Sequence, residues 1–395
     1  LGVFQHLMFM LFSNSRVFKR GSAMSEQPKS SKLISLLKAG TASVSLFLAA
    51  CATPITQGPK VDSADASAAK QRQQEVRASG KKIEAPDSPY VNFPDEQRLA
   101  NVANRIFVAA APYCSRTKMT YNIGIGTPDS GQPVVMDSQS TLQPGDRLVA
   151  VNGQRVSPGQ AGRNAYLDAR DRGANYGQQI TLDALRNGQR VSAKLDPVKA
   201  CDYGLGIIPG NTPMGQVFNA FADGQKVHIS PVVMKKLRND ADLGFVVAHE
   251  LAHNSMGHMD SKMSNARIGA GLGVLADIAV GVLSKGQVNT QGFGTKTGIA
   301  VGAQTYSVDF EKEADYVGGY INVRAGYDAS AGQRVADRMA MESKSADAIQ
   351  YSSSHPATMD RAAAAEATEA EIAKKKALNQ PIVPNVKAGK TFKVN

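Results

Sequence analysis

The sequence predicts an α+β fold: a mainly helical domain with a small β-sheet edge, into which a β-rich domain is inserted. Three observations support this prediction. An apolar stretch without proline at 242–258 has the composition of a buried helix. Residues 142–195 contain short apolar strands next to Asn-Gly turns, a pattern typical of β-hairpins. Residues 217–230 form a shorter hairpin with a turn at Asp223-Gly224 and supply the sheet edge.

The predicted helix carries His249-Glu250-Leu251-Ala252-His253, an H-E-x-x-H motif. Helix positions i and i+4 lie on one face about one turn apart, so both imidazoles can reach one metal ion. Glu250 projects about 100° round the helix, which suits a general base acting on water. The alternative is a helix with two structural histidines, but buried imidazoles without partners are costly.

A catalytic zinc site needs a third protein ligand and an open fourth position. The best candidates lie in 308–319, where Glu311 and Asp315 again share one helical face. Glu311 can complete a His-His-Glu set, and Asp315 can orient a ligand. Glu313 remains an alternative ligand on composition, and a solvated acidic helix face is the alternative to any site.

The last histidine lies in Ser352–Arg361. Pro356 suits the first turn of a helix, so we expect His355 at a helix start and Arg361 one and a half turns later. A helix rich in Ala, Glu and Lys should continue to about Leu378. Considered alone, a histidine at this position is more often a capping or surface residue than a metal ligand.

The motifs H-E-x-x-H, E-x-x-x-D and H-P-x-x-x-x-R, in this order over 210–365, resemble the gluzincin metallopeptidases of the HtpX, BepA and CAAX prenyl protease type. The resemblance implies a zincin-type domain with one Zn²⁺ per chain. It assigns His249, His253 and Glu311 to the metal, and Glu250 to the general base. Because Asp315 matches the second acidic position, the resemblance selects Glu311 as the ligand.

The same resemblance implies catalytic roles for His355 and Arg361. Either side chain can stabilise an oxyanion, and in some periplasmic relatives the matching histidine occupies the fourth zinc position and inhibits the enzyme. The chain departs from the family pattern in a Gly- and Ala-rich run at 266–304. Its apolar stretch at 268–283 is too short for a membrane helix and contains Asp277, so we expect a small-residue helix and a flexible lid near the cleft.

The N-terminal region predicts export. Met24 is a plausible start, which excludes 1–23 from the fold prediction. Three lysines precede a short apolar run at 39–50, and the run ends in Leu-Ala-Ala-Cys51. This ending matches the lipobox of bacterial lipoproteins; the alternative is an ordinary signal peptide with a chance cysteine. We therefore expect a signal peptide at 1–50, lipidation of Cys51 and, because Ala52 follows it, an outer-membrane lipoprotein facing the periplasm.

Charge and cysteine content fit an exported protein. The chain carries a net charge of +11, of which the first 50 residues supply +5, so the remaining +6 is mildly basic. The basic residues form no stripe with interleaved aromatics, so we predict no nucleic-acid partner. Cys114 and Cys201 are the remaining pair, and an oxidising compartment favours a disulfide between them. Two buried free thiols are the alternative.

The cysteine pair brackets a distinct domain at 119–200. Its sequence P-G-D-x-L-x-x-V-N-G at 144–153, followed by a hairpin that turns at Asn187-Gly188, is similar to PDZ domains. Such domains bind extended peptides by strand addition, and Ile123–Gly126 is our candidate for part of the groove. A PDZ-like fold that lacks a groove and acts as a spacer or lid is the alternative.

The other segments complete the predicted organisation. Residues 93–118 should form an amphipathic helix packed on the peptidase domain at 201–365, because Leu99, Val102, Ile106, Phe107 and Ala110 share one face. Residues 51–92 have few large apolar side chains and are predicted to be a flexible tether after the lipidated cysteine. Residues 366–395 should form a helical extension and a polar tail.

These features predict a zinc-dependent endopeptidase anchored to the membrane through Cys51, which cleaves unfolded or misassembled envelope proteins. The strand Lys226–Ser230 is our candidate for pairing with an extended substrate, and His228 on it should be structural or substrate-facing. Two alternatives remain. One is a non-catalytic chaperone or assembly factor; the other is a PDZ adaptor with a closed, four-ligand zinc site.

Overall fold

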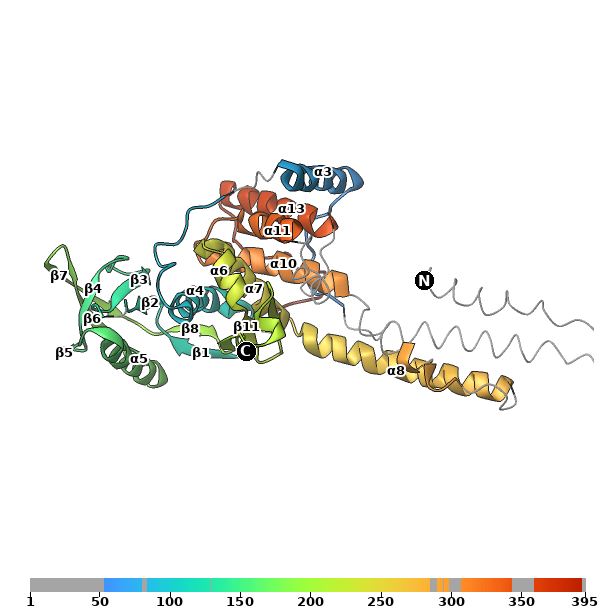
Figure 1. Ribbon diagram of the computed structural model, residues 1–395, viewed down its shortest axis with the longest axis horizontal. Helices are drawn as coiled ribbons and strands as arrows, with labels where there is room; N and C mark the ends of the chain where they lie inside the picture. Colours follow the sequence, from blue (N-terminus) through green and yellow to red (C-terminus); the bar gives the residue numbers. More distant parts are fainter. Residues whose placement is uncertain are drawn as a thin grey trace, which may run out of the picture. The chain divides into compact units, whose positions relative to one another are not determined.

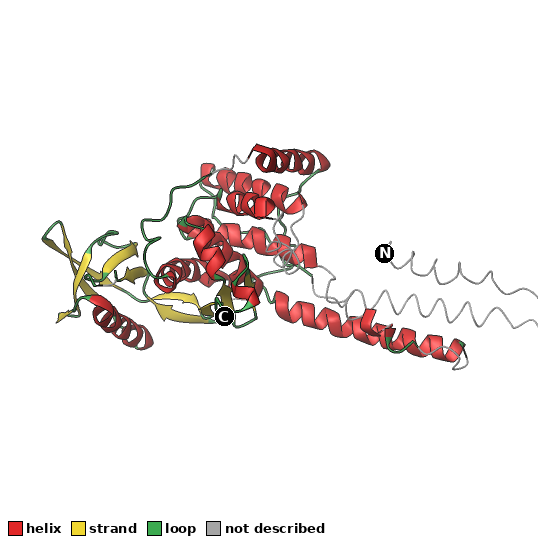
Figure 2. Ribbon diagram, in the orientation of Figure 1, coloured by secondary structure: helices red, strands yellow, loops and turns green. Residues whose placement is uncertain are grey.

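The computed structural model describes residues 53–79, 84–128, 130–284, 290–293, 295–297, 307–342 and 359–392 (Figure 1). The predicted signal peptide, Cys51 and His355 lie outside the described residues. The α+β prediction is confirmed. Within the described part of the chain, the named strands fall between β1 (Thr117–Thr120) and β11 (Lys226–Ile229), whereas most of the other elements are helices (Figure 2).

The central helix of the larger domain is α7 (Asp240–Ser255), and it is buried at every position from 243 to 254. The side chain of Asn239 caps its first turn by accepting hydrogen bonds from the backbone amides of Ala241 and Asp242. A cap and an apolar sequence together explain why this segment is a core helix. The helices packed on α7 are α4 (Asp95–Ala110), α8 (His258–Leu283), α10 (Ser307–Arg324) and α11 (Ala331–Glu342).

Helix α10 approaches α7 closely at the position of the first motif histidine. A Cβ atom on Gly318 would lie only 3.0 Å from the backbone nitrogen of His249. On the α7 side, Ala248 and Ala252 are fully buried and small. The absence of a side chain at Gly318 and the small side chains of α7 therefore allow the two helix axes to lie close together, so that side chains of both helices can converge.

Helix α4 forms within the segment 93–118 predicted to be an amphipathic helix, but it ends at Ala110; residues 111–113 form a 3₁₀ helix, and residues 117 and 118 belong to β1. Its apolar residues join the core around α7, and the preceding prediction that it packs on the larger domain is confirmed. Arg98 is buried on α4 and donates from Nε to Asp240 Oδ1 at 2.8 Å and from Nη2 to the carbonyl of Leu237 at 2.8 Å. Helices α6 (Pro231–Lys236) and α13 (Met359–Ala377) also belong to this domain.

A three-stranded sheet lies beside α7. The predicted hairpin is present as β10 (Ala220–Ala222) and β11, and Gly224 has the positive φ of +89° that its turn requires. The sheet order is β10-β11-β9, with β9 (Gly204–Ile207) parallel to β11. Both sides of β11 are thus paired, and the expectation that this strand pairs with substrate is wrong. Two of the four residues of β9 are glycines, which have low strand propensity, so the sequence did not predict this strand.

The inserted domain has its own hydrophobic core and an antiparallel sheet in the order β2-β3-β4-β6-β7. Both Asn-Gly turns adopt positive φ angles, 50° and 77° at Asn152-Gly153 and 50° and 83° at Asn187-Gly188, as expected for tight hairpin turns. The elements are β2 (Ile123–Gly126), β3 (Val134–Ser138), β4 (Arg147–Val151), β5 (Gln154–Arg155), α5 (Gly159–Asn175), β6 (Ile180–Arg186) and β7 (Gln189–Leu195).

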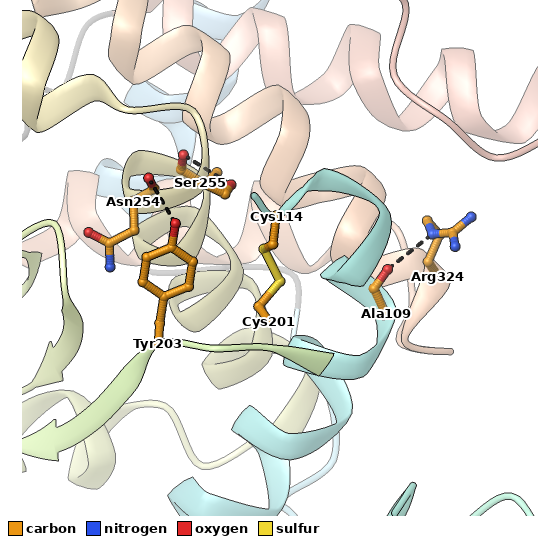
Figure 3. Close-up of a disulfide and its surroundings, with 8 residues drawn as sticks. Ala109, Cys114, Cys201, Tyr203, Asn254, Ser255 and Arg324 are labelled. Carbon is orange, nitrogen blue, oxygen red and sulfur yellow. Dashed lines mark hydrogen bonds between the residues drawn. A yellow bond between two sulfur atoms is a disulfide. The ribbon is translucent and has the colours of Figure 1, made fainter. Parts of the chain in front are cut away.

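The predicted disulfide between Cys114 and Cys201 is present at the base of the inserted domain (Figure 3). It lies next to the two-stranded sheet of β1 and β8 (Val198–Cys201), in which Thr117 is opposite Cys201. The bond closes a loop of 87 positions, so it fixes the two chain segments that lead into and out of the inserted domain. We call the disulfide and the β1–β8 sheet the neck of the inserted domain. Two short 3₁₀ helices flank it in the sequence, η1 (Ala111–Tyr113) and η2 (Pro213–Gly215).

The prediction that residues 51–92 form a flexible tether is wrong for those that form a helix. Residues 63–79 form helix α3 (Ser63–Ser79), which packs on α11 and α13. Ala69 is fully buried in a small cluster with Ala362 and Ala363 of α13, and Arg72 forms an ion pair with Glu366. Alanine provides enough apolar surface here because it faces other alanines, a pairing that composition alone does not reveal.

The Gly- and Ala-rich run begins as part of α8, which follows α7 after a turn at Gly257 with a φ of +71°. Asp277 of α8 accepts hydrogen bonds from the backbone amide and hydroxyl of Thr295 at 2.9 and 2.8 Å. Among the described residues, no helix combines the length and hydropathy that crossing a bilayer would require.

Candidate metal centre

Helices α7 and α10 bring His249, His253 and Glu311 together. The two Nε2 atoms of the histidines are 3.1 Å apart. Each lies 3.4 Å from a carboxylate oxygen of Glu311, Oε2 for His249 and Oε1 for His253. All three residues are buried, with exposed fractions of 3%, 2% and 0%. The three donor atoms therefore converge on one point inside the domain.

This donor set fits a metal ion. One ligand atom from each residue can be chosen so that all lie within 4.8 Å of one another. Two imidazole nitrogens and one carboxylate oxygen are the ligands of many catalytic zinc sites, in which a fourth position stays open for water or substrate. The donor chemistry thus matches the zinc site that the sequence predicts.

Glu250 follows His249 directly on α7 and is fully buried. A helix turns by about 100° per residue, so Glu250 leaves α7 in a direction different from that of the two histidines. Its negative charge contributes to a raised pKa at His249. The carboxylate is therefore part of the same buried electrostatic environment as the ligand set.

Asp315 and Arg361 hold the first histidine. Nδ1 of His249 lies 2.9 Å from Asp315 Oδ1. Arg361 donates from Nε and Nη2 to the two oxygens of Asp315 at 2.7 and 2.9 Å, and its Nη1 lies 3.3 Å from Glu311 Oε2. Arg361 is only 8% exposed. These contacts favour a role in holding two acidic groups over the predicted role at an oxyanion.

The ionisation of these groups in the metal-free protein follows from their contacts. Burial disfavours the charged form of His249, but hydrogen bonds from its ring to Asp315 and Glu311 outweigh this and raise its pKa to about 10. Burial opposes the charge of Asp315 too, yet Arg361 and His249 lower its pKa to about 2. Burial lowers the pKa of His253 well below its usual value. Metal ligands bind through deprotonated nitrogen or oxygen atoms, so metal binding and protonation of His249 oppose each other.

The second histidine has partners that sequence reasoning missed. Nδ1 of His253 lies 2.9 Å from Nδ1 of His258, and Nε2 of His258 lies 2.9 Å from Glu313 Oε2. Glu313, the alternative ligand, thus contacts His258, whereas Glu311 faces the metal-binding histidines. The signal for this contact in the sequence is a third histidine, His258, five positions after His253 and outside the H-E-x-x-H motif.

The neck of the inserted domain is attached to the end of α7. Tyr203 follows Cys201 by two positions, and its hydroxyl donates to the carbonyl of Asn254 at 3.3 Å (Figure 3). The side chain of Asn254 accepts from the amide of Gly224 at 2.7 Å and donates to the carbonyl of Lys226 at 3.0 Å. The residue after His253 therefore connects the active-site helix to both the neck and the hairpin turn.

His228 is not among the metal-binding group. Its Nε2 lies 2.8 Å from Asp223 Oδ2, and its ring stacks on Phe221 with centroids 4.5 Å apart. These contacts stay within the hairpin, which agrees with the structural role considered for it.

An H-E-x-x-H helix and a glutamate from a following helix, held around one point in a helical domain, define a metallopeptidase of the gluzincin class. Residues 212–369 match the model of Peptidase family M48, so this segment is similar to that family of metal-dependent peptidases. The match confirms the resemblance to the HtpX and BepA type. Searches of curated proteins and of solved structures returned no match.

Proposed function

We propose that this protein is a zinc-dependent endopeptidase. The observation that carries the proposal is the convergence of His249 Nε2, His253 Nε2 and the Glu311 carboxylate, with Glu250 on the same buried helix. Zinc bound there would supply a Lewis acid and lower the pKa of a water molecule. We therefore propose both that the bound metal is zinc and that the enzyme cleaves internal peptide bonds of its substrates.

The residues of the chain have separate roles in this mechanism. Glu250 takes a proton from the attacking water and passes it to the leaving amine nitrogen. Asp315 holds the ring of His249 through Nδ1 and keeps its Nε2 directed at the metal position. Arg361 balances the charges of Asp315 and Glu311. The role of His355, as an oxyanion group or an inhibitory fourth ligand, remains part of the proposal.

The direct test is digestion of casein by the protein, with the fragments identified by mass spectrometry. We expect fragments from internal bonds, loss of cleavage after treatment with a chelator, and recovery on adding Zn²⁺. Release of terminal residues only would contradict endopeptidase activity. Cleavage that survives complete metal removal would contradict the metallopeptidase mechanism.

We further propose that the protein is a lipoprotein of the outer membrane that faces the periplasm, and that it cleaves misfolded or misassembled envelope proteins. The Leu-Ala-Ala-Cys51 sequence after an apolar run supports the lipid anchor. Cys51 and Ile55 are four residues apart, so the backbone between them spans at most about 14 Å. Because Ile55 contacts Glu313, the anchor would hold the peptidase domain close to the membrane. Incorporation of labelled palmitate that is lost in Cys51→Ala tests this.

We propose that the inserted domain is PDZ-like and lacks an open peptide groove. Two side chains of α5 reach β2, since the hydroxyl of Tyr166 donates to the carbonyl of Ile123 at 3.5 Å and Nε of Arg163 donates to that of Ile125 at 3.3 Å. A peptide adding to β2 would compete with these contacts. Binding of unstructured peptides to the wild-type protein, abolished by substitutions in β2, would favour an adaptor with an open groove.

A non-catalytic chaperone or assembly factor remains the competing function. It would use the same domain surfaces for binding alone. Zinc retained at full stoichiometry, with no cleavage of casein by either the wild-type protein or His355→Ala, would favour this function over a peptidase.

A further inference from the structure

A series of buried hydrogen bonds leads from the second metal-binding histidine to the start of the described chain. Nδ1 of His253 lies 2.9 Å from Nδ1 of His258, whose Nε2 lies 2.9 Å from Glu313 Oε2. The other oxygen of Glu313 accepts from the backbone amides of Ile55 and Thr56 at 2.8 and 2.6 Å. His258 and Glu313 are only 1% and 4% exposed, so bulk water does not compete for these bonds.

The donors and acceptors in this series have one consistent order. If Nε2 of His253 binds a metal ion, the single proton of the neutral ring is on Nδ1. Nδ1 then donates a hydrogen bond to Nδ1 of His258. The proton of His258 is then on Nε2, which donates to Glu313. Backbone amides only donate, so Oε1 of Glu313 is the acceptor at the far end. The series therefore fixes the tautomer of His253 that leaves Nε2 open to a metal.

The segment that supplies the two amides is held in place by the C-terminal part of the chain. The amide of Gln57 donates to the carbonyl of Asn385 at 2.9 Å, and the amide of Lys387 donates to the carbonyl of Ile55 at 2.9 Å. Thr56 pairs with Val386 in an antiparallel bridge and is 5% exposed. Residues 53–57, which we call the N-terminal segment, are thus docked on the peptidase domain and contact its interior.

We propose that His258 and Glu313 are positioning residues for the metal ligand His253, and that docking of the N-terminal segment on Glu313 completes the metal centre. The inference rests on the proposed metal site but not on cleavage of any substrate. It makes metal binding sensitive to displacement of the N-terminal segment, which follows the proposed lipidation site directly in the sequence. If the N-terminal segment only covered the surface of the domain, its displacement would not change metal binding.

Glu313→Gln is a near-isosteric test of the first part. Glutamine presents one acceptor and one donor group, so it cannot accept from His258 and from the two backbone amides at once. We expect Zn²⁺ affinity, measured by competition with a chromophoric chelator, to fall about 10- to 100-fold, as for other lost partners of metal ligands. The visible absorption bands of the Co²⁺-substituted protein should also change, because they report ligand geometry. Glu371→Gln is the matched control, since Glu371 accepts from Tyr316, Tyr320 and Asn385 without contacting the metal centre.

Thr56→Pro tests the second part, because proline removes one of the two amides that Glu313 accepts. Gln57→Pro is its control: it removes the neighbouring amide, whose partner is the carbonyl of Asn385. We expect Thr56→Pro to weaken Zn²⁺ binding about tenfold, at the lower end of the range for outer partners. Gln57→Pro leaves both amides on Glu313 and removes only one docking bond, so it should weaken Zn²⁺ binding less. Thermal unfolding of all four variants checks that they are folded.

Unchanged Zn²⁺ affinity and an unchanged Co²⁺ spectrum in Glu313→Gln would overturn the proposal. A Zn²⁺ affinity of Thr56→Pro equal to that of the wild-type protein would overturn the role of the N-terminal segment. Casein cleavage is measured in parallel. If the wild-type protein with bound Zn²⁺ does not cleave casein but the metal affinities differ as expected, the endopeptidase proposal fails while this inference is supported.

Discussion

Nδ1 of His249 lies 2.9 Å from Oδ1 of Asp315, so the first histidine of the H-E-x-x-H helix is oriented by a carboxylate from a different helix. Asp315→Asn keeps an acceptor for the ring but removes the charge that pairs with Arg361. We expect metal affinity to fall about 10- to 100-fold, measured by competition with a chelator. Asp309→Asn, in the exposed first turn of α10, is the control. Equal affinity in both variants would remove Asp315 from the metal centre.

Arg361 contacts the carboxylates of Glu311, which is fully buried, and of Asp315, whose side chain is 11% exposed. Arg361→Gln would leave these two charges without their guanidinium partner, so we expect the metal-free protein to lose about 3–5 kcal/mol of unfolding free energy. Bound metal would replace part of the missing positive charge, and the loss should be smaller with Zn²⁺. Urea unfolding with and without metal measures both values. A variant with unchanged stability and reduced turnover would instead favour the oxyanion role.

The disulfide between Cys114 and Cys201 closes a loop of 87 positions. A Cys114→Ser, Cys201→Ser double variant should lose about 4 kcal/mol of unfolding free energy, because the unfolded chain gains conformational freedom. Denaturant unfolding of the variant and of the wild-type protein under oxidising conditions measures the difference. Identical midpoints would show that the bond constrains little. A reducing agent should lower the wild-type midpoint and leave that of the variant unchanged.

Asp146 of the inserted domain is 2% exposed and accepts from Arg186 at 2.8 and 2.7 Å and from the amide of Gln143 at 2.8 Å. The hydrogen bond from Arg186 lowers the pKa of Asp146. Its contribution to stability is therefore present above the unfolded pKa of about 3.9 and is lost as the pH falls through the lower folded value.

Asp146→Asn should therefore destabilise the protein by about 1–3 kcal/mol at neutral pH. The difference from the wild-type protein should shrink as the pH falls below about 4, because the wild-type residue then becomes protonated. Thermal unfolding followed between pH 7 and pH 3 measures this. A difference that is constant over this range would show that the ionised carboxylate is not responsible.

The parts of the site that the sequence predicted are those with local spacing. His249, Glu250 and His253 lie within one helical turn, and Asp315 follows Glu311 by one turn, so helical periodicity alone relates them. Choosing Glu311 over Glu313 required the family resemblance, because position alone does not show which carboxylate faces α7. The fold followed the same rule: hairpins with Asn-Gly turns and the amphipathic helix at 95–110 were predictable from local patterns.

What the sequence did not reveal depends on contacts between distant segments. The bond between Glu313 and the amides of Ile55 and Thr56 joins residues more than 250 positions apart. Backbone donors leave no mark on the sequence, so nothing in residues 53–57 indicated that they dock. The strand β9 was missed for a related reason, since a Gly-Leu-Gly-Ile sequence becomes a strand only through its partner β11.

The central claim is that Glu250 acts as the general base beside a metal held by His249, His253 and Glu311. The most direct measurement is the rate of casein cleavage by Glu250→Gln and by the wild-type protein at equal, quantified zinc content. We predict that the variant retains zinc and that its rate falls by about 10²- to 10⁴-fold. Zinc retained with an undiminished rate would contradict the assignment of Glu250 and with it the proposed mechanism.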